Sequence, residues 1–143
     1  MGYGMGAAIG ACMATGKRTV LFTGDGSFGM NLNEMATAVS QNLPITIVVL
    51  NNGMLGMIRQ WQSLFFNNHY MATVLERKTD FVKLADAFGA KGFRAFNVEE
   101  LEKAIDDAFA IEGPAVIDCV IPPEENVFPM VPPNGSLDNM ILK

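Results

Sequence analysis

Apolar runs typical of strands alternate with helix-like patterns along most of the chain. Residues 19–23 (TVLFT) and 45–50 (ITIVVL) are continuous apolar runs of the kind that is buried in a parallel sheet. Between them, apolar residues recur at helical spacing, at Leu32, Met35, Ala36 and Val39. Asn31 and Glu34 predict a capping box at the start of this helix. Strand, helix and strand in this order predict a right-handed βαβ crossover.

The second half of the chain continues the alternation. A short helix is predicted over about 54–62, and two further helices begin at the N-cap residues Asp80 and Asn97. Strands are predicted over 92–96 and 115–121. Alternating strands and helices indicate an α/β fold with a doubly wound, mostly parallel sheet.

The two ends of the chain are less regular. Small residues recur every four positions near the start, at Gly2, Gly6, Gly10 and Ala14. In a membrane this spacing would favour helix dimerisation, but the apolar run over 1–16 is shorter than the roughly 20 residues that a bilayer requires. We therefore expect a helix whose backbone closely approaches a sheet or a ligand. The tail from Pro122 is rich in Pro, Asn and Gly and is expected to run over the surface.

Composition fits one globular domain over residues 1–143. Half of the residues are hydrophobic and 17% are charged, which supplies enough apolar material for a core. A net charge of −5 argues against general binding to nucleic acid, which requires a basic face. Cys12 and Cys119 are too far apart for a CxxC site, and we expect both to be buried in a protein from a reducing compartment. A cytoplasmic location is expected.

Polar residues gather where the first two predicted strands end. GDGS at 24–27 follows the first strand, and NNG at 51–53 follows the second. Because ligands bind beyond the carboxyl ends of parallel strands, we expect Asp25 and Asn52 to lie side by side at a binding edge. Magnesium is commonly held by one or two carboxylates together with substrate phosphates. The pattern predicts a magnesium ion that bridges these two side chains and a backbone carbonyl to a diphosphate.

Two other interpretations stay open from the residues alone. Residues 24–29 match the dinucleotide fingerprint GxGxxG, although Asp25 would then face a pyrophosphate, and the second strand ends in Asn51 and Asn52 where a ribose-binding acid is expected. Alternatively, Asp25 only caps a helix or turn, and 51–53 is a plain loop. Helical spacing would likewise suit a buried stripe of apolar residues at Met54, Met57, Ile58 and Trp61.

Four segments resemble a known enzyme family. GDG at 24–26, a helix, an apolar strand and NN at 51–52 resemble the thiamin diphosphate (ThDP) motif of ThDP-dependent enzymes. The segments MGYGMGAAIGA, GDGSFGMNLNE, LNNGMLGMIRQWQ and PMVPPNGSLDNMI resemble the carboxyl-terminal part of the acetolactate synthase (acetohydroxyacid synthase) catalytic subunit. The resemblance covers essentially the whole chain. It implies the ThDP-binding fold, here the diphosphate-binding domain, truncated at its amino-terminal end.

The resemblance implies a metal site and a substrate channel. Asp25, Asn52 and the backbone carbonyl of Met54 match the magnesium ligands of the family. Met57 and Trp61 match residues that face the substrate channel, where Trp61 would help to select the second 2-oxoacid.

The resemblance also implies a set of cofactor contacts. Met1 matches the bulky residue that lies under the cofactor and bends its two rings together, and Met30 matches a residue beside the aminopyrimidine. Gly26 and Ser27 match contacts to the diphosphate. The full set of expected cofactor-binding residues is Met1, Gly24, Gly26, Ser27, Met30, Asn52, Gly53 and Met54.

Family members condense two pyruvates, or pyruvate and 2-oxobutyrate, with decarboxylation, in branched-chain amino-acid biosynthesis. They form homodimers or tetramers and bind a small regulatory subunit. Their catalytic glutamate comes from an amino-terminal domain of a neighbouring subunit, and a middle domain holds FAD. Neither domain is in this sequence, so no catalytic residue is assigned to it, and we expect an enzyme fragment that forms little acetolactate alone.

The resemblance favours a cytoplasmic enzyme, or one in a plastid or mitochondrion if the source is eukaryotic. Other interpretations are another ThDP-dependent carboligase, decarboxylase or oxidase, or a stand-alone diphosphate-binding half. Outside enzymes, a nucleotide-binding or inactive α/β module is the alternative.

Overall fold

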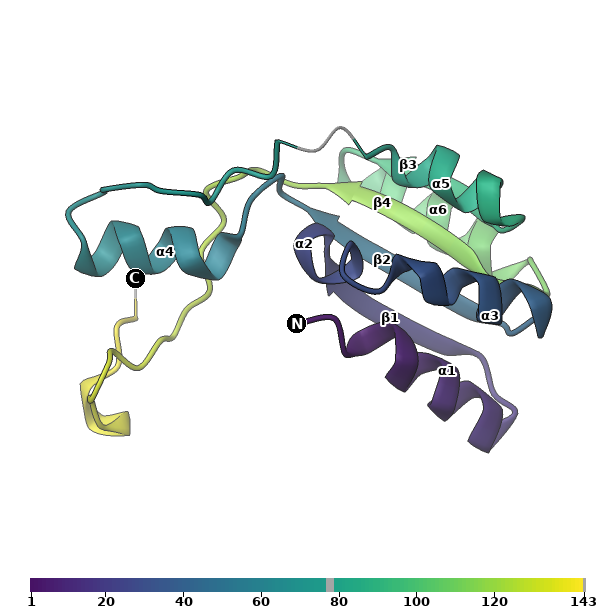
Figure 1. Ribbon diagram of the computed structural model, residues 1–143, viewed down its shortest axis with the longest axis horizontal. Coiled ribbons are helices and arrows are strands. Elements are labelled where there is room, and N and C mark those ends of the chain that lie inside the picture. The colour runs from purple at the N-terminus through teal and green to yellow at the C-terminus, as the bar shows by residue number, and fades with distance from the viewer. Residues whose placement is uncertain (77–78, 143) are drawn as a thin grey trace.

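A parallel sheet organises the chain, whose computed structural model describes residues 1–76 and 79–142. The described strands lie in the order β1-β2-β4-β3, and each neighbouring pair is parallel (Figure 1). These strands are β1 (Thr19–Gly24), β2 (Ile45–Asn51), β3 (Lys91–Ala95) and β4 (Ala115–Val120). The predicted α/β class and the adjacency of the first two strands are confirmed.

Helices cover both faces of the sheet, which confirms the doubly wound arrangement. The helices are α1 (Gly4–Thr15), α2 (Asp25–Phe28), α3 (Met35–Ser40), α4 (Gly56–Phe65), α5 (Phe81–Phe88) and α6 (Val98–Phe109), with short 3-10 turns at Leu32–Glu34 and Leu137–Asn139. One core cluster joins α1, α3 and α5 to one sheet face, and a second joins α6 to the other (Figure 1). No helix within 1–76 or 79–142 is long and apolar enough to cross a membrane.

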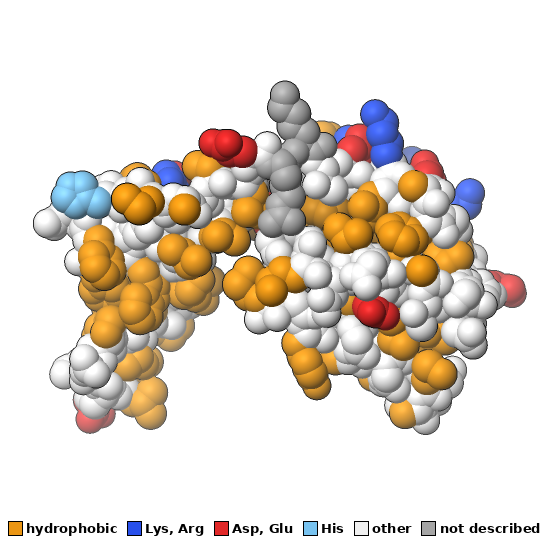
Figure 2. Space-filling view, in the orientation of Figure 1, with side chains coloured by type: hydrophobic (Ala, Val, Ile, Leu, Met, Phe, Trp, Pro, Cys, Tyr) orange, Lys and Arg blue, Asp and Glu red, His pale blue; other side chains and the backbone are white. Residues whose placement is uncertain are grey.

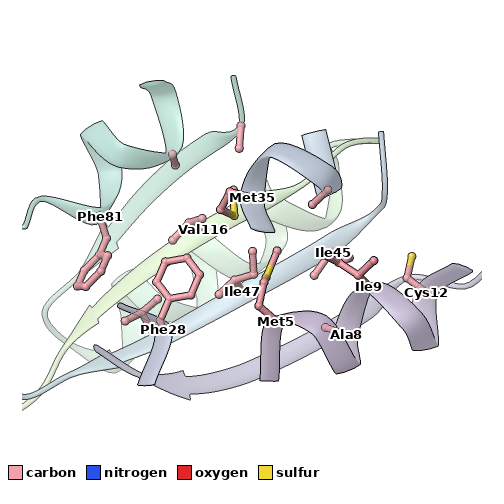
Figure 3. Packing of buried hydrophobic residues seen from close by; sticks show 14 residues of the cluster. Met5, Ala8, Ile9, Cys12, Phe28, Met35, Ile45, Ile47, Phe81 and Val116 are labelled. Carbon is pink, nitrogen blue, oxygen red and sulfur yellow. The ribbon is translucent and has the colours of Figure 1, made fainter. Parts of the chain in front are cut away.

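The central strand β2 is buried on both faces, as its continuous apolar run predicts. Ile45 and Ile47 point into the larger cluster with Met35 (Figure 3). Val48 belongs to the cluster under α6. In the larger cluster Phe28 packs on Phe81, with ring centroids 5.7 Å apart. This contact holds α2, the short helix after β1, against α5.

Both cysteines are buried and free, as expected. Cys12 lies in the cluster under α1, and Cys119 lies in the cluster under α6. Burial raises the pKa of the Cys119 thiol, and the neighbouring Asp118 carboxylate raises it further. Both thiols therefore act as small apolar side chains in the core.

The two predicted helix caps in the second half are confirmed. The Asp80 side chain accepts hydrogen bonds from two backbone N–H groups in the first turn of α5, and Gly89 ends this helix at a positive φ of 89°. Asn97 accepts from the Glu100 N–H at 2.8 Å, while the Glu100 carboxylate accepts from the Asn97 amide at 2.9 Å. Local sequence signals therefore set these boundaries.

The capping box predicted at Asn31 is wrong. The chain there forms a 3-10 turn followed by α3, and the Asn31 side chain makes no cap bond. Instead, its amide donates to the Gly2 carbonyl at 2.7 Å, and the Glu34 carboxylate accepts from the Thr37 hydroxyl at 3.3 Å. A tertiary contact thus replaces the local cap, and Ala36, predicted to face inward, is exposed.

The small residues of α1 do not make the close approach that was predicted for them. A Cβ built on Gly6 or Gly10 meets nothing within 4 Å, and Ala14 is exposed. The close approach comes from Gly4, where a Cβ would lie 2.9 Å from Leu21 Cδ1 of β1. The helix packs through its other face, with buried residues Met5, Ala8, Ile9 and Cys12.

Beside the sheet, α4 and the tail after β4 form a second part of the molecule (Figure 1). The surface is hollowed between this part and the sheet, and apolar side chains gather on the α4 side (Figure 2). α4 begins at Gly56, two residues later than predicted. Because α4 follows the carboxyl end of β2, the hollow lies beyond the carboxyl ends of β1 and β2. This is the edge of a parallel sheet at which ligands bind.

Candidate functional site

A cavity of about 320 Å³ opens between the carboxyl ends of β1 and β2, the start of α4 and the tail. Most of its lining is apolar, and its polar groups come mainly from the two strand ends. Its lining residues are Met1, Gly24, Asp25, Gly26, Ser27, Leu50, Asn52, Met54, Leu55, Gly56, Met57, Ile58, Gln60, Ile121, Glu125 and Val127. A polar end and a broad apolar wall suit a ligand with a charged tail and an apolar or aromatic body.

Asp25 follows directly after β1 and is buried, with 5% of its surface exposed. Its Oδ1 accepts from the Gly26 N–H at 2.9 Å, and its Oδ2 accepts from the Gly53 N–H at 3.0 Å. The second bond joins the end of β1 to the turn after β2, because the two strands pair in parallel with Gly24 opposite Leu50. Neighbouring parallel strands therefore bring the predicted carboxylate to the Asn52 turn.

Asn52 lies in the turn that connects β2 to α4. Its Oδ1 accepts from the Met54 N–H at 3.0 Å, and Gly53 has a positive φ of 66° that a residue with a side chain rarely adopts. A Cβ on Gly56 would lie 2.9 Å from the Asn52 Nδ2. The turn is thus tightly wound around the Asn52 side chain, which lines the cavity together with Asp25.

Gly26 and Ser27 form the floor of the cavity next to Asp25. A Cβ on Gly26 would lie 3.0 Å from Leu55 Cδ2 and 3.7 Å from Met1 Cε, so a side chain at this position would crowd the site. The Ser27 hydroxyl accepts from the Gly2 N–H at 3.0 Å, which ties the chain start to this floor. Glycine at position 26 therefore lets Leu55 pack against the floor of the cavity.

A second polar network braces the end of β2 from behind. Asp118 of β4, nearly fully buried, accepts from the Asn51 amide at 2.9 Å and from Arg94 Nε at 3.0 Å. Arg94 also pairs with Asp80. A hydrogen bond from the Lys83 N–H lowers the pKa of the Asp80 carboxyl, and Arg94 lowers it further. The network ties Asn51, the residue before Asn52, to β4 and β3.

The sequence comparisons decide the family. Residues 1–119 match the family described as "Thiamine pyrophosphate enzyme, C-terminal TPP binding domain". The chain belongs to this family. TPP is the same molecule as ThDP, so the interpretation of the GDG and NN segments as a ThDP motif agrees with the family match.

Relatives of this TPP-family chain are acetolactate synthases. The chain is 43% identical to the acetolactate synthase isozyme 2 large subunit of Escherichia coli K12, over 100% of the chain and 26% of that protein. It is 43% identical to the large subunit of Porphyra purpurea and 39% identical to a probable large subunit of Methanocaldococcus jannaschii, over 99% of the chain and 24% of each. The chain thus spans about a quarter of the length of these relatives.

A solved structure shares the fold. A thiamine diphosphate-dependent 4-hydroxybenzoylformate decarboxylase of Rhodococcus jostii RHA1 superposes with a TM-score of 0.79 at 28% identity, over 87% of this chain and 24% of that one. The expected ThDP-binding fold is therefore confirmed.

The donor set of this TPP-family site fits a magnesium diphosphate. Among residues 1–76 and 79–142, no group of three or more His, Cys, Asp or Glu could hold a metal ion by itself. Asp25 contributes a buried carboxylate and Asn52 an amide oxygen, so a hard cation here would need further oxygens. A diphosphate beside Gly26 would supply such oxygens, and a cation next to Asp25 would offset its negative charge.

The structure brings together most of the expected site residues. The residues that line the cavity are Met1, Gly24, Asp25, Gly26, Ser27, Asn52, Met54 and Met57. Gly53 lies just behind them, where it donates to Asp25 and lines a small cavity of about 70 Å³. Two expected residues are elsewhere: Met30 is 57% exposed and packs beside Gly2, and Trp61 lines a neighbouring cavity that shares Met57.

Sequence reasoning missed the wall formed by the tail. Glu125 and Val127 line the cavity, although the tail was expected only to run over the surface. Gln60 of α4 and Ile121 after β4 also line it. The end of the predicted strand at Ile121 carried a usable signal, because ligands bind beyond the carboxyl ends of parallel strands. Nothing in the composition of the tail indicated that Glu125 and Val127 return to the site.

Proposed function

We propose that this chain supplies the diphosphate- and magnesium-binding half of the ThDP site in an acetolactate synthase. The observation that carries the proposal is the hydrogen bond from the Gly53 N–H to the buried Asp25 carboxylate, beside Asn52 in the same cavity. It joins a carboxylate and a carboxamide from two consecutive parallel strands at one polar cavity end. Residues 1–143 form a single domain in this proposal.

The polar end of the cavity would hold the metal and the diphosphate. Asp25, Asn52 and the backbone carbonyl of Met54 would bind Mg²⁺, and Gly26 and Ser27 would contact the phosphate oxygens. The cation would balance the charge of the diphosphate against Asp25. Gly24 and Gly53 shape the two turns that present these groups.

The apolar wall would enclose the rings of the cofactor. When bound, ThDP supplies a nucleophilic carbon and an electron sink for the decarboxylation of a 2-oxoacid. Met1, whose Cε approaches Gly26, would pack under the rings, and Met30 is proposed as the residue beside the aminopyrimidine. Exclusion of water by this wall strengthens the electrostatic contacts at the polar end.

We propose pyruvate and 2-oxobutyrate as substrates, because the relatives at about 40% identity are acetolactate synthases. Met57 and Trp61 would line the channel by which the second 2-oxoacid enters, since their neighbouring cavity adjoins the ThDP cavity through Met57. The catalytic glutamate, the FAD and the regulatory subunit would belong to other domains and chains of a homo-oligomeric enzyme. A cytoplasmic or organellar location is part of the same proposal.

Calorimetric titration tests the proposed cofactor. We expect ThDP to bind the 143-residue chain in the presence of Mg²⁺, and the affinity to fall by at least about 100-fold when EDTA removes the metal, because two anions would then face each other without a cation. NAD⁺ with Mg²⁺ serves as the control ligand and should not bind. Equal affinity for ThDP with and without metal, or binding of NAD⁺ in its place, would contradict the proposal.

A further inference from the structure

The side chain of Gln60 joins α4 to the tail. It is 1% exposed, and its amide contacts both backbone polar groups of one tail residue. Nε2 donates to the Val127 carbonyl at 2.8 Å, and Oε1 accepts from the Val127 N–H at 2.9 Å. Nε2 also lies 3.4 Å from Met130 Sδ. The Gln60 side chain thus gives hydrogen-bond partners to both the N–H and the carbonyl of Val127, as a neighbouring strand would. The surrounding tail has few other backbone hydrogen bonds.

These bonds hold one wall of the ThDP cavity in place. Glu125 and Val127 line the cavity from the tail, and Met54, Met57 and Gln60 itself line it from the α4 side. The ion pair of Arg59 with Glu124 joins the same two segments, and both Nε and Nη2 of Arg59 donate to the Glu124 carboxylate. This pair ends on Glu124, whose side chain is 61% exposed, whereas the Gln60 amide is buried and holds the backbone of Val127 itself.

The polar end of the cavity lies on other elements. Asp25, Gly26 and Ser27 follow β1, and Asn52 follows β2, so none of them depends on the tail for its backbone position. The Gly53 bond to Asp25 and the Asn51 bond to Asp118 brace this end from within the sheet part. A change at Val127 should leave the diphosphate end intact.

We propose that Gln60 is a positioning residue that fixes residues 125–127 as the wall facing the cofactor rings, so that its loss weakens binding of whole ThDP and spares binding of a bare diphosphate. The inference rests on the proposed ThDP function and gives a role to Gln60, to which the expected cofactor, metal and channel contacts assign none. The polar end of the cavity is then supported by the sheet, and the wall at residues 125–127 is supported by α4 through Gln60.

Gln62 provides a matched control. Its amide makes the same pair of bonds to another residue, because Nε2 donates to the Met71 carbonyl at 3.1 Å and Oε1 accepts from the Met71 N–H at 3.0 Å. Met71 is 79% exposed and does not line the ThDP cavity. Loss of this second clamp should therefore loosen a surface loop without moving the cavity wall.

The test compares Gln60→Met and Gln62→Met in the full chain by calorimetry, with ThDP plus Mg²⁺ and with inorganic pyrophosphate plus Mg²⁺ as ligands. For Gln60→Met we expect the Kd of ThDP to rise about tenfold and the Kd of pyrophosphate to stay within about twofold, since only the ring wall loses its order. Hydrogen exchange should also accelerate at the Val127 N–H. Gln62→Met should change neither Kd.

If Gln60→Met fails to fold, Gln60→Glu replaces it in the test. Glutamate keeps the oxygen that accepts from the Val127 N–H and loses the donor to the Val127 carbonyl, so we again expect weaker binding of ThDP and unchanged binding of pyrophosphate. Equal weakening of ThDP and pyrophosphate would indicate a merely structural role and overturn the inference. An unchanged Kd of ThDP in both Gln60 variants, with wild-type binding intact, would overturn the inference and leave the proposed function standing. Absence of ThDP binding by the wild-type chain would overturn both.

Discussion

Asp25→Ala is expected to weaken magnesium-dependent ThDP binding by at least about 100-fold, because loss of groups that merely support a metal ligand already costs about 10–100-fold. The substitution removes the buried carboxylate that would balance the cation, together with the acceptor for the Gly53 N–H. Calorimetric titration of ThDP at fixed Mg²⁺ concentration measures the change. Asp25→Asn keeps the shape and should still lose most of the affinity, since it removes the charge.

Asp86→Ala is the control for this effect, because Asp86 is an exposed acid on α5 away from the cavity. It should leave the Kd of ThDP unchanged. Thermal unfolding without ligand checks that the Asp25 variants remain folded. A folded Asp25→Ala chain that binds ThDP as tightly as the wild type would exclude Asp25 as a metal ligand.

Asp118→Ala is expected to lower the free energy of unfolding by about 3 kcal/mol, which is large against the 5–15 kcal/mol of a typical domain. Asp118 is buried and accepts from Asn51 and Arg94. Its removal leaves the Asn51 amide without this acceptor and Arg94 without its inner partner. The Arg94 side chain is 35% exposed, so water reduces the cost and places it at the low end for a broken buried pair.

Urea unfolding followed by circular dichroism measures this loss. Asp106→Ala, at an exposed position on α6, is the control and should change the unfolding free energy by less than about 0.5 kcal/mol. Asp118→Ala should also loosen the end of β2, because Asn51 immediately precedes Asn52. A loss of stability no greater than that of Asp106→Ala would show that the network does not brace the strand end.

Much of the fold could be predicted because its signals are local. The continuous apolar run of β2 reports burial on both faces, and Asp80 and Asn97 cap the helices that follow them. Pairing of β1 with β2 follows from the handedness and short connection of a βαβ unit. The juxtaposition of Asp25 with the Asn52 turn then follows from the sheet edge alone.

The remaining features depend on contacts between distant residues. Asparagine at position 31 favours a helix N-cap locally, but the Asn31 amide donates instead to the carbonyl of Gly2, which is 29 positions away in the sequence. Spacing alone suggested close packing at Gly6 and Gly10, while the apolar residues beside them hold α1 on the sheet. No sequence pattern indicated that Gln60 would capture Val127, because the two residues are 67 positions apart.

The family resemblance indicated that Met54, Met57 and Trp61 belong to a binding site, which their helical spacing alone could not show. Helical spacing of Met54, Met57 and Trp61 is equally typical of a buried stripe, yet Met57 is 50% exposed and lies between two cavities. The tail wall was missed by both approaches, because neither the composition of 122–131 nor the motif marks Glu125 and Val127. A wall of this kind is formed by folding of the whole chain.

Asp25 and Asn52 are proposed to bind one divalent cation that also binds a diphosphate, and the anomalous signal of Mn²⁺ in crystals grown with ThDP locates such an ion. We expect a single manganese peak at metal–ligand distance, about 2.0–2.2 Å, from an Asp25 carboxylate oxygen and from the Asn52 amide oxygen, with diphosphate oxygens completing its shell. A manganese peak bound to ThDP but out of reach of both side chains would contradict it.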